Sequence, residues 1–296
     1  MKSKRLILGC GYVGTAVAEK WLAAGHKVWG VSRNAQTLAR IDHPEFRPVI
    51  AEVDSSAWHK EVPHSPEIVL NCVSSAGGGV EGYRKSYLGG NQSLVDWAGK
   101  ARPGRILYTS STAVYPFTDG REVWEKDAGG PDLSETGSVV FESEKVLLRD
   151  SFCGPSTTVL RLAGIYGPGR HYLLDQVRAG DRVIAGRGDY YLNLIFREDI
   201  VAAIDSVLAV PATKGRAYNV SDGSPTPKAE VVNWIADRLG MPRPVFDPNA
   251  KSRRKMRINR AGASPNRQIR IDEIKADAGW KPSYPSFRDG FVRLGI

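Results

Sequence analysis

Apolar and polar positions follow two different periodicities along the first half of the chain. Short apolar runs such as residues 6–8 have the length of buried strands, and stretches such as residues 13–24 place apolar side chains at helical spacing. The predicted strands are residues 5–9, 28–31, 46–53, 68–73, 105–109 and 157–162, and the main helices are residues 13–24, 83–99 and 136–150. This alternation predicts an α/β fold with a Rossmann doubly wound parallel sheet.

After residue 162 the alternation of predicted strands and helices becomes less regular. Two short strands, at 192–196 and 217–220, are predicted around a helix at 198–209, with further helices at 173–179, 228–239, 271–278 and 286–294. We expect residues 1–162 to form the dinucleotide-binding domain, with residues 192–222 returning to it. Residues 163–191 and 223–296 are expected to form a smaller C-terminal α/β region that binds substrate.

The first predicted strand ends in the pattern Gly-x-Gly-x-x-Gly, directly before a helix. In that context Gly9 makes a tight turn, Gly11 lets the backbone approach a pyrophosphate, and Gly14 lets the helix pack on the strand. The anion would lie at the positive end of the helix dipole. A simple glycine turn is the alternative. The cofactor-binding residues expected from this motif are Gly9, Cys10, Gly11, Tyr12, Val13 and Gly14.

The ends of the next strands bear on the choice of cofactor. NAD-selective folds place an acidic residue after the second strand, whereas this chain has Ser32 and Arg33 there. A guanidinium suits a 2′-phosphate, so we expect NADP, with NAD as the second choice. The alternative is a solvated Arg33. The third strand leads to Asp54, near the adenine. The fourth ends at Val73, and Ser74 begins a glycine-rich loop that either lies beside the cofactor or is a flexible surface loop.

Composition restricts the class of protein. The chain has 296 residues, 42% hydrophobic and 25% charged, which is an ordinary globular balance. No apolar run approaches the ~20 residues of a membrane span. The apolar stretch after residues 1–5, which include three basic residues, is too short for a signal peptide and is interrupted by glycines. Cys10, Cys72 and Cys153 form no metal-binding pattern and fit a reduced chain, so we expect a cytoplasmic protein without a metal.

With these residues in view, the chain resembles the extended short-chain dehydrogenase/reductases, in particular the NAD(P)-dependent nucleotide-sugar epimerase/dehydratase family. The resemblance covers nearly the whole chain. It comprises, in order, the glycine motif, Thr109-Ser110-Ser111-Thr112-Ala113-Val114-Tyr115, residues 160–169 (LRLAGIYGPG), residues 196–200 (FREDI), residues 218–220 (YNV) and residues 279–282 (GWKP). The resemblance implies a hydride-transferring protein whose two long helices at the sheet edge often form a homodimer.

The family's catalytic residues are a Ser or Thr, matched here by Ser111, and a Tyr-x-x-x-Lys pair on the next helix. The preferred alignment puts Thr136 at the tyrosine and Val140 at the lysine. A second alignment keeps Lys145 but replaces the tyrosine with Phe141. Either way the tyrosine is absent, which indicates an atypical branch. A phenol beside an ammonium can exchange a proton near neutral pH, and a threonine hydroxyl cannot do so efficiently.

Three side chains are candidates to replace the missing acid–base. Tyr115 and Tyr166 each lie beside a loop that the family places near the nicotinamide. His171 belongs to the residue type that titrates near neutral pH. The alternative for the tyrosines is packing or positioning, and for the histidine a surface position.

The net charge of +9 is concentrated in residues 251–270, which carry eight Lys or Arg and no acidic residue. The family that the chain resembles uses C-terminal arginines to bind the diphosphate of a nucleotide sugar. We therefore expect some of Arg253, Arg254, Arg257 and Arg260 to bind an anionic small-molecule substrate. A nucleic-acid site lacks aromatic interleaving and is disfavoured, and a solvated loop is the remaining alternative.

Two functions follow from these observations. The first is an oxidoreductase or epimerase that acts on a hydroxyl or carbonyl of an anionic small molecule, such as a nucleotide sugar. The second is a non-catalytic NADP(H)-binding sensor, because the binding motif is intact while the Tyr and Lys are missing.

Overall fold

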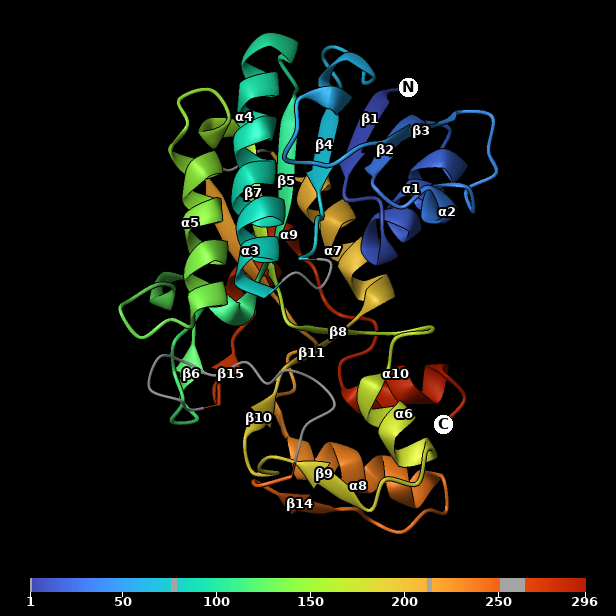
Figure 1. Ribbon diagram of the computed structural model, residues 1–296, viewed down its shortest axis with the longest axis vertical. Coiled ribbons are helices and arrows are strands. Elements are labelled where there is room, and N and C mark those ends of the chain that lie inside the picture. The colour runs from blue at the N-terminus through green and yellow to red at the C-terminus, as the bar shows by residue number, and fades with distance from the viewer. Residues whose placement is uncertain (1, 76–78, 212–214, 251–263) are drawn as a thin grey trace. The chain divides into compact units, whose positions relative to one another are not determined.

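The computed structural model describes residues 2–75, 79–211, 215–250 and 264–296. The chain forms two compact units (Figure 1). The first unit comprises Met1–Val114, Glu135–Arg161 and Ile204–Tyr218, and the second comprises Tyr115–Ser134, Leu162–Ala203 and Asn219–Ile296.

A seven-stranded sheet organises the first unit, with the strand order β12-β7-β5-β4-β1-β2-β3. The pairs β1–β2, β1–β4, β2–β3 and β4–β5 are all parallel. The order reverses beside β1, and this is where doubly wound sheets bind ligands at the carboxyl ends of the strands. The predicted Rossmann sheet is therefore confirmed. Its strands are β1 Lys4–Leu8, β2 Lys27–Ser32, β3 Phe46–Ile50, β4 Ile68–Asn71, β5 Arg105–Ser111, β7 Thr157–Leu162 and β12 Arg216–Val220.

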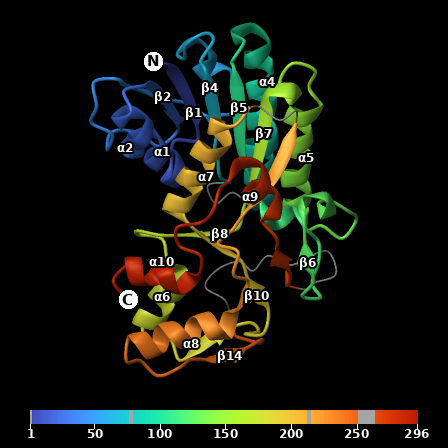
Figure 2. The same ribbon diagram turned by 180° about the vertical axis from the view of Figure 1, so that it is seen from behind.

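Helices cover both faces of this sheet. Figures 1 and 2 show α4 (Gly90–Ala101) and α5 (Glu135–Arg149) on one face and α7 (Arg197–Ala209) on the other. An ion pair between Lys20 and Asp205 joins α7 to α1 (Tyr12–Ala23). The central strands β1 and β4 contain continuous apolar runs because both faces of a covered parallel sheet are buried. The shorter elements are α2 Ala35–Leu38 and the 3-10 turns η1 Ala57–Lys60, η3 Thr112–Val114 and η5 Gly154–Ser156.

The helix predicted at residues 83–99 is instead three consecutive segments. An α-helical turn, α3 (Gly79–Tyr83), leads into a π-helical segment, η2 (Arg84–Gly89), and then into α4. Tyr83 and Tyr87 stack across the junction with ring centroids 5.1 Å apart. Apolar periodicity alone does not distinguish a π segment from an α-helix, and such segments are frequent at functional sites.

The second unit is built from short elements around its own core. The strand predicted at 192–196 is divided at Asn193 into β10 and β11, and the Asn193 side chain bonds the backbone of Arg267 and Ile269. Tyr166, Phe196 and Phe287 belong to the core. The ladders are β10 Tyr191–Leu192 with β13 Thr226–Pro227, β11 Leu194–Phe196 with β8 Gly164–Tyr166, β14 Val245–Asp247 with β9 Val183–Ala185, and β15 Gln268–Ile269 with β6 Glu122–Val123. The helices are α6 Tyr172–Arg178, α8 Lys228–Arg238, α9 Asp272–Ala278, α10 Phe287–Arg293 and the 3-10 turn η4 Glu125–Asp127.

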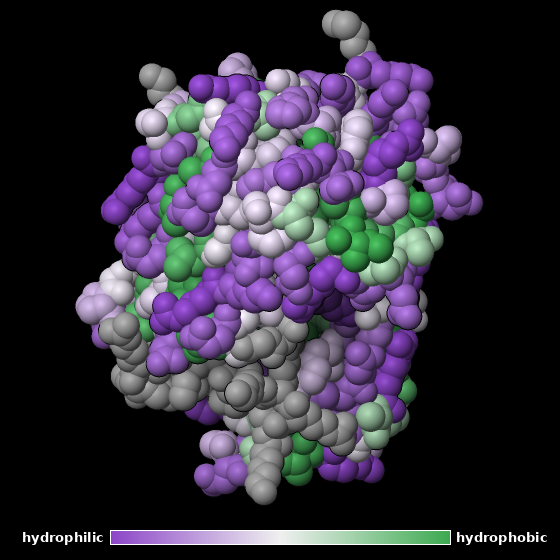
Figure 3. Space-filling view, turned by 45° about the horizontal axis from the view of Figure 1, so that its top comes forward, coloured by the Kyte–Doolittle hydropathy of each residue, from purple (hydrophilic) through white to green (hydrophobic). Residues whose placement is uncertain are grey.

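The surface is mainly hydrophilic on the face drawn in Figure 3, with smaller hydrophobic areas between the polar residues. The exposed large apolar side chains among the described residues include Ile50 and Val292. In the part of the chain that the structure describes, no helix has the length and apolar character needed to cross a bilayer.

Candidate functional site

The glycine turn after β1 is closed by contacts that tolerate no side chain at two of its three glycines. Gly9 has a φ of +78°, and a Cβ there would lie 2.6 Å from the backbone of Val73. A Cβ at Gly14 would lie 2.9 Å from the carbonyl oxygen of Gly9. The amides of Gly9 and Cys10 both donate to the carbonyl of Val31, at 3.0 and 2.9 Å, which ties the ends of β1 and β2 together.

Gly11 differs from its two neighbours in the motif. A Cβ at this position would find only the Gly9 carbonyl oxygen, at 3.8 Å, so packing within the protein does not demand glycine. Gly11 is the N-cap of α1, and it has no side chain to bond the first turn of the helix. The space beside Gly11 and the helix N-terminus together fit a pyrophosphate at close approach to the backbone.

Cys10 lies inside this turn and is fully buried. Burial raises the pKa of its thiol to about 12. A thiol that stays protonated at neutral pH is a poor nucleophile. Cys10 therefore has the properties of a small apolar packing residue.

The residues expected to bind the adenine ribose lie at the end of β2. Ser32 Oγ accepts a hydrogen bond of 3.1 Å from the amide of Asn34, and Asn34 Oδ1 caps α2 by accepting one of 3.1 Å from Thr37. Arg33 extends from this turn, and its Nη1 lies 3.9 Å from Glu52 Oε2. The same carboxylate oxygen lies 3.7 Å from Lys85 Nζ. The sequence interpretation did not include Glu52 or Lys85.

The ends of β3 and β4 place the other expected cofactor residues. Asp54 follows β3. A Cβ added at Gly89 would lie 3.0 Å from the Cβ of Asp54, so the two residues are close neighbours. Val73 is buried against Gly9, whereas Ser74 is exposed in the loop beyond it. In the first unit the structure thus brings Val73 together with the glycine turn.

A buried amide network lies below the loop after β4. Asn71 Nδ2 donates to Asn91 Oδ1 at 2.6 Å, and Asn91 Nδ2 donates to the carbonyl of Ser143 at 2.8 Å. The Ser143 hydroxyl is 2.7 Å from the Tyr108 hydroxyl, and burial raises the pKa of Tyr108 well above its ordinary value. The network joins β4, β5, α4 and α5, and it holds the carboxyl end of the sheet in place.

Ser111 is the last residue of β5, and its half-buried hydroxyl accepts a 3.2 Å hydrogen bond from the amide of Ala113. The strand is anchored one residue earlier, where Ser110 Oγ donates to Glu144 Oε1 at 2.5 Å. Glu144 also forms a buried ion pair with Arg161, with Nη2 and Oε2 2.8 Å apart. These contacts fix the backbone that carries Ser111 against α5.

The positions aligned with the family's Tyr and Lys lie in the first two turns of α5. Thr136 is partly buried near the start of the helix, and Val140 is fully buried. In the second alignment, the Lys145 ammonium lies 4.4 Å from the centre of the Phe141 ring and 2.6 Å from Glu142 Oε1. In neither alignment does α5 present a tyrosine.

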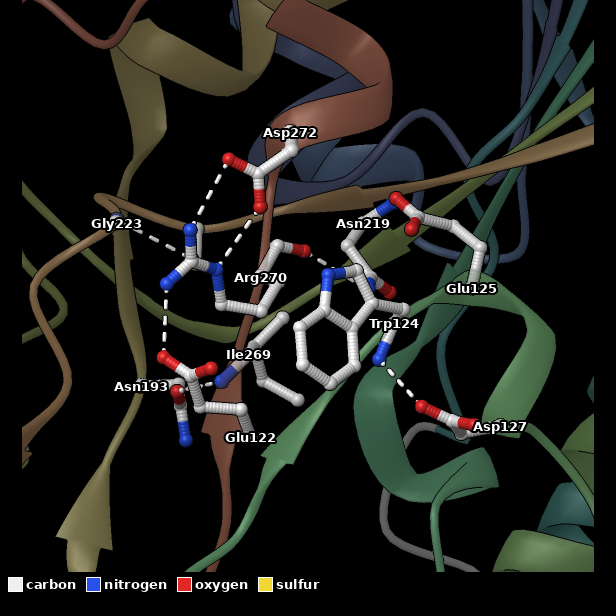
Figure 4. Close-up of polar contacts among 11 residues, drawn as sticks. Glu122, Trp124, Glu125, Asp127, Asn193, Asn219, Gly223, Ile269, Arg270 and Asp272 are labelled. Atoms are coloured by element: carbon white, nitrogen blue, oxygen red, sulfur yellow. Dashed lines mark hydrogen bonds and ion pairs between the residues drawn. The ribbon is translucent and has the colours of Figure 1, made fainter.

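Tyr115 belongs to the second unit and is only 1% exposed. Its hydroxyl donates to Asn219 Oδ1 at 2.6 Å. Figure 4 shows Asn219 between Glu125 and Arg270: its amide donates to Glu125 Oε1 at 2.8 Å, and its side chain donates to the Arg270 carbonyl at 3.0 Å. These are the contacts of a side chain that positions its neighbours.

Tyr166 is held by a different set of contacts in the second unit. Its ring lies 5.2 Å from the rings of both Phe196 and Phe291, and Gly290 leaves room for it because any Cβ there would overlap the tyrosine hydroxyl. Burial is the main reason that the pKa of Tyr166 is raised, with Asp222 and other carboxylates adding to it. A raised pKa disfavours the ionised phenolate at neutral pH.

His171 precedes α6, and its Nδ1 lies 2.7 Å from Asp175 Oδ1. Among the described residues, no group of three or more His, Cys, Asp and Glu is placed to hold a metal ion. Arg253, Arg254, Arg257 and Arg260, the expected substrate-binding residues, lie outside the described residues.

The model of the NAD-dependent epimerase/dehydratase family matches residues 6–221, from β1 to the residue after β12. The chain belongs to this family. The resemblance seen in the sequence is thereby confirmed at the family level.

Two relatives and one solved structure illustrate the range of this family. Protein YeeZ of Escherichia coli (strain K12) is 30% identical over 252 residues, which cover 82% of this chain and 86% of that protein. The 3-diazoavenalumate denitrifying reductase of a Streptomyces species is 27% identical over 309 residues, which cover 96% and 97%. DesIV, a dTDP-glucose 4,6-dehydratase of Streptomyces venezuelae solved with NAD and TYD bound, is 20% identical with a TM-score of 0.80, and the match covers 98% of this chain and 95% of that one. This last similarity shows the fold alone.

Proposed function

We propose that the protein is an NAD(P)-dependent oxidoreductase or epimerase-type enzyme that acts on a hydroxyl or carbonyl of an anionic small molecule, such as a nucleotide sugar. The observation that carries this proposal is the open space at Gly11 between two closely packed glycines, at the point where the strand order reverses. Membership of the NAD-dependent epimerase/dehydratase family supports it.

The roles of the residues follow from their places on the sheet. Backbone amides at the start of α1 bind the pyrophosphate, and Val73 and Gly9 form the adjoining wall. The bound nicotinamide supplies or accepts the hydride. Ser111, at the carboxyl end of β5, donates a hydrogen bond to the reacting substrate oxygen and orients it. In the proposal, Thr136, Tyr115, Tyr166 and His171 stay candidates for the proton transfer that accompanies the hydride.

NADP is the proposed cofactor, with NAD as the second choice. Arg33 extends from the end of β2, where a guanidinium can bond the oxygens of a 2′-phosphate. DesIV was solved with NAD, so the choice has to be tested on this chain itself.

The proposed substrate is anionic because of the basic residues 251–270. Arg253, Arg254 and Arg257 are assigned to its diphosphate or another acidic group on the strength of the sequence. A homodimer through the long helices stays a prediction from the family resemblance.

Turnover decides the proposal. Purified protein is mixed with NADPH or NADH and a panel of ketones, quinones and sugar nucleotides, and absorbance at the reduced-nicotinamide band is followed, with product analysis for epimerisation. We expect reaction with at least one anionic substrate, and loss of that reaction in Ser111→Ala. Tight cofactor binding without turnover on any substrate would contradict the enzymatic function.

A non-catalytic NADP(H)-binding sensor is the second candidate, and one observation favours it. Val140 is fully buried at the position aligned with the family's lysine, so α5 provides no ammonium there. A sensor would bind NADP(H) and change its conformation or its partner without consuming the reduced cofactor.

A further inference from the structure

The carboxyl ends of β2 and β3 bring an arginine and a glutamate side by side. The two strands pair in parallel as far as Ser32 opposite Ile50, and the amide of Ala51 donates to the Ser32 carbonyl at 3.2 Å. Arg33 directly follows Ser32, and Glu52 lies two residues after Ile50. Lys85 approaches the same carboxylate from the π-helical segment η2.

This cluster contains two cations and one shared anion. Glu52 Oε2 is 3.9 Å from Arg33 Nη1 and 3.7 Å from Lys85 Nζ. Both distances exceed the 2.7–3.2 Å of an N–H···O hydrogen bond. The three side chains are 47%, 44% and 52% exposed in the order Arg33, Glu52, Lys85. Exposed ion pairs at such distances contribute little stability, so water or another anion can displace the carboxylate.

We propose that Arg33 and Lys85 together form the subsite for the 2′-phosphate of NADP, and that Glu52 occupies this subsite until the phosphate displaces it. The inference rests on the proposed function and deepens it. It adds Lys85 as a second cation and Glu52 as a competing anion. Together these two residues set how strongly the protein distinguishes NADP from NAD.

The chemistry of the three groups supports this exchange. A phosphate monoester presents three oxygens and carries close to two negative charges, so it can accept charge-assisted hydrogen bonds from a guanidinium and an ammonium at once. The single carboxylate of Glu52 has one charge and reaches neither cation at hydrogen-bond distance. NAD has only a hydroxyl at that position. It leaves Glu52 between the cations and gains nothing from Lys85.

The neighbouring residue supplies a matched control. Arg84 precedes Lys85 in the same segment and is 56% exposed, but it pairs with Glu81 at 3.4 Å instead of with Glu52. Arg84→Gln removes the same unit of charge from the same surface. Long-range electrostatic effects are therefore common to both variants, and a direct contact belongs to Lys85 alone.

The test measures dissociation constants for NADP and NAD by calorimetry in the full-length chain and in Lys85→Gln, Arg84→Gln and Glu52→Gln. Thermal melts check that each variant is folded. Loss of a charge-assisted contact predicts that Lys85→Gln weakens NADP binding about tenfold and leaves NAD within about twofold. Glu52→Gln is expected to strengthen NADP binding several-fold, and Arg84→Gln to match the parent protein.

Each other outcome contradicts a defined part of the proposal. An unchanged ratio of NADP to NAD affinity in Lys85→Gln, or a change equal to that of Arg84→Gln, overturns the two-cation subsite and leaves the proposed function intact. Weaker NADP binding in Glu52→Gln overturns the competing role of Glu52. If the parent protein binds neither cofactor, the proposed function itself fails.

Discussion

The turn after β1 and the start of α5 lie in the same unit, yet the sequence predicts that they depart from the family pattern to very different degrees. The turn retains all three glycines, and two of them are required by contacts within the protein. The start of α5 has Thr136 and a buried Val140 at the positions aligned with the family's Tyr and Lys. The cofactor-binding end depends on backbone shape, whereas the proton-transfer end depends on particular functional groups.

This difference shows what each kind of site demands. A phosphate-binding turn needs space and free amides, and a single Cβ in the wrong place removes both. A proton-transfer group can be supplied by any side chain that reaches the reacting oxygen with a suitable pKa. The first is therefore recognisable in a sequence, and the second can move to another element without leaving a local motif.

The largest effect is expected from alanine at two neighbouring glycines. Gly9→Ala forces a side chain into a φ of +78° and against the Val73 backbone at 2.6 Å. We expect a loss of about 3 kcal/mol or more of unfolding free energy. Gly11→Ala should stay within about 1 kcal/mol of the parent protein, because its Cβ meets only one atom. Urea unfolding measures both values.

Gly9→Ala and Gly11→Ala should also differ in cofactor affinity. Gly11→Ala is the variant in which affinity falls without a matching loss of stability. Gly11→Ala should weaken cofactor binding about tenfold or more, because the pyrophosphate can no longer approach the amides. Equal losses of stability in the two variants, or full cofactor affinity in Gly11→Ala, would contradict the different roles assigned to the two glycines.

Ser111→Ala tests the proposed catalytic residue at the end of β5. Removing the hydroxyl that orients the reacting oxygen should lower kcat by about 100-fold. The cofactor dissociation constant should not change, because the proposal assigns the Ser111 hydroxyl to the substrate and not to the cofactor. Steady-state kinetics with the substrate found in the panel, together with calorimetry, separate the two quantities. A kcat within twofold or so of the parent value would remove Ser111 from the reaction.

Arg33→Asp should shift cofactor preference by a smaller amount. Replacing a cation by an anion is expected to weaken NADP binding by about tenfold, or ~1.4 kcal/mol, and to improve NAD binding through its ribose hydroxyls. Competition binding of the two cofactors measures the change. If the preference stays as in the parent protein, Arg33 does not contact the 2′-phosphate.

The last prediction is a pH dependence rather than a change of activity or affinity, and it concerns the surroundings of Tyr166 in the second unit. Burial, with the nearby Asp199 and Asp289, raises the pKa of Asp222 to about 8. The native state therefore holds a proton that the unfolded chain has lost above pH 4, and stability falls as pH rises from about 4 to 8. The slope is at most about 1.4 kcal/mol per pH unit. Asp222→Asn should flatten the melting temperature over this range, and an unchanged slope would show that Asp222 is not its source.

The sequence predicts the sheet because apolar runs and the glycine motif are local features. The first strand, predicted at 5–9, is observed at Lys4–Leu8, and the glycine turn follows directly. Glu52 and Lys85 could not be found in this way. They are 33 residues apart in the chain and meet only after β3 and the π segment are in place.

The same limit applies to Asn193, Asn219 and Glu144. Each is an ordinary polar residue in the sequence, and each makes its contacts to residues that lie on other elements. Tyr115 and Tyr166 stand out in the sequence because they adjoin recognisable loops. Their burial and hydrogen-bond partners depend on tertiary packing, which no local pattern encodes.

The π-helical segment η2 also has a consequence for how this chain can diverge. Such a segment corresponds to a single extra residue accommodated within a helix. The π geometry absorbs that residue locally, so the turns on either side of the segment keep the faces that an uninterrupted helix would give them. Lys85 lies inside the segment beside Glu52, whereas Asn91 lies beyond it in the buried amide network. A one-residue deletion within the segment would therefore change the direction of Lys85 while Asn91 and the strands kept their register.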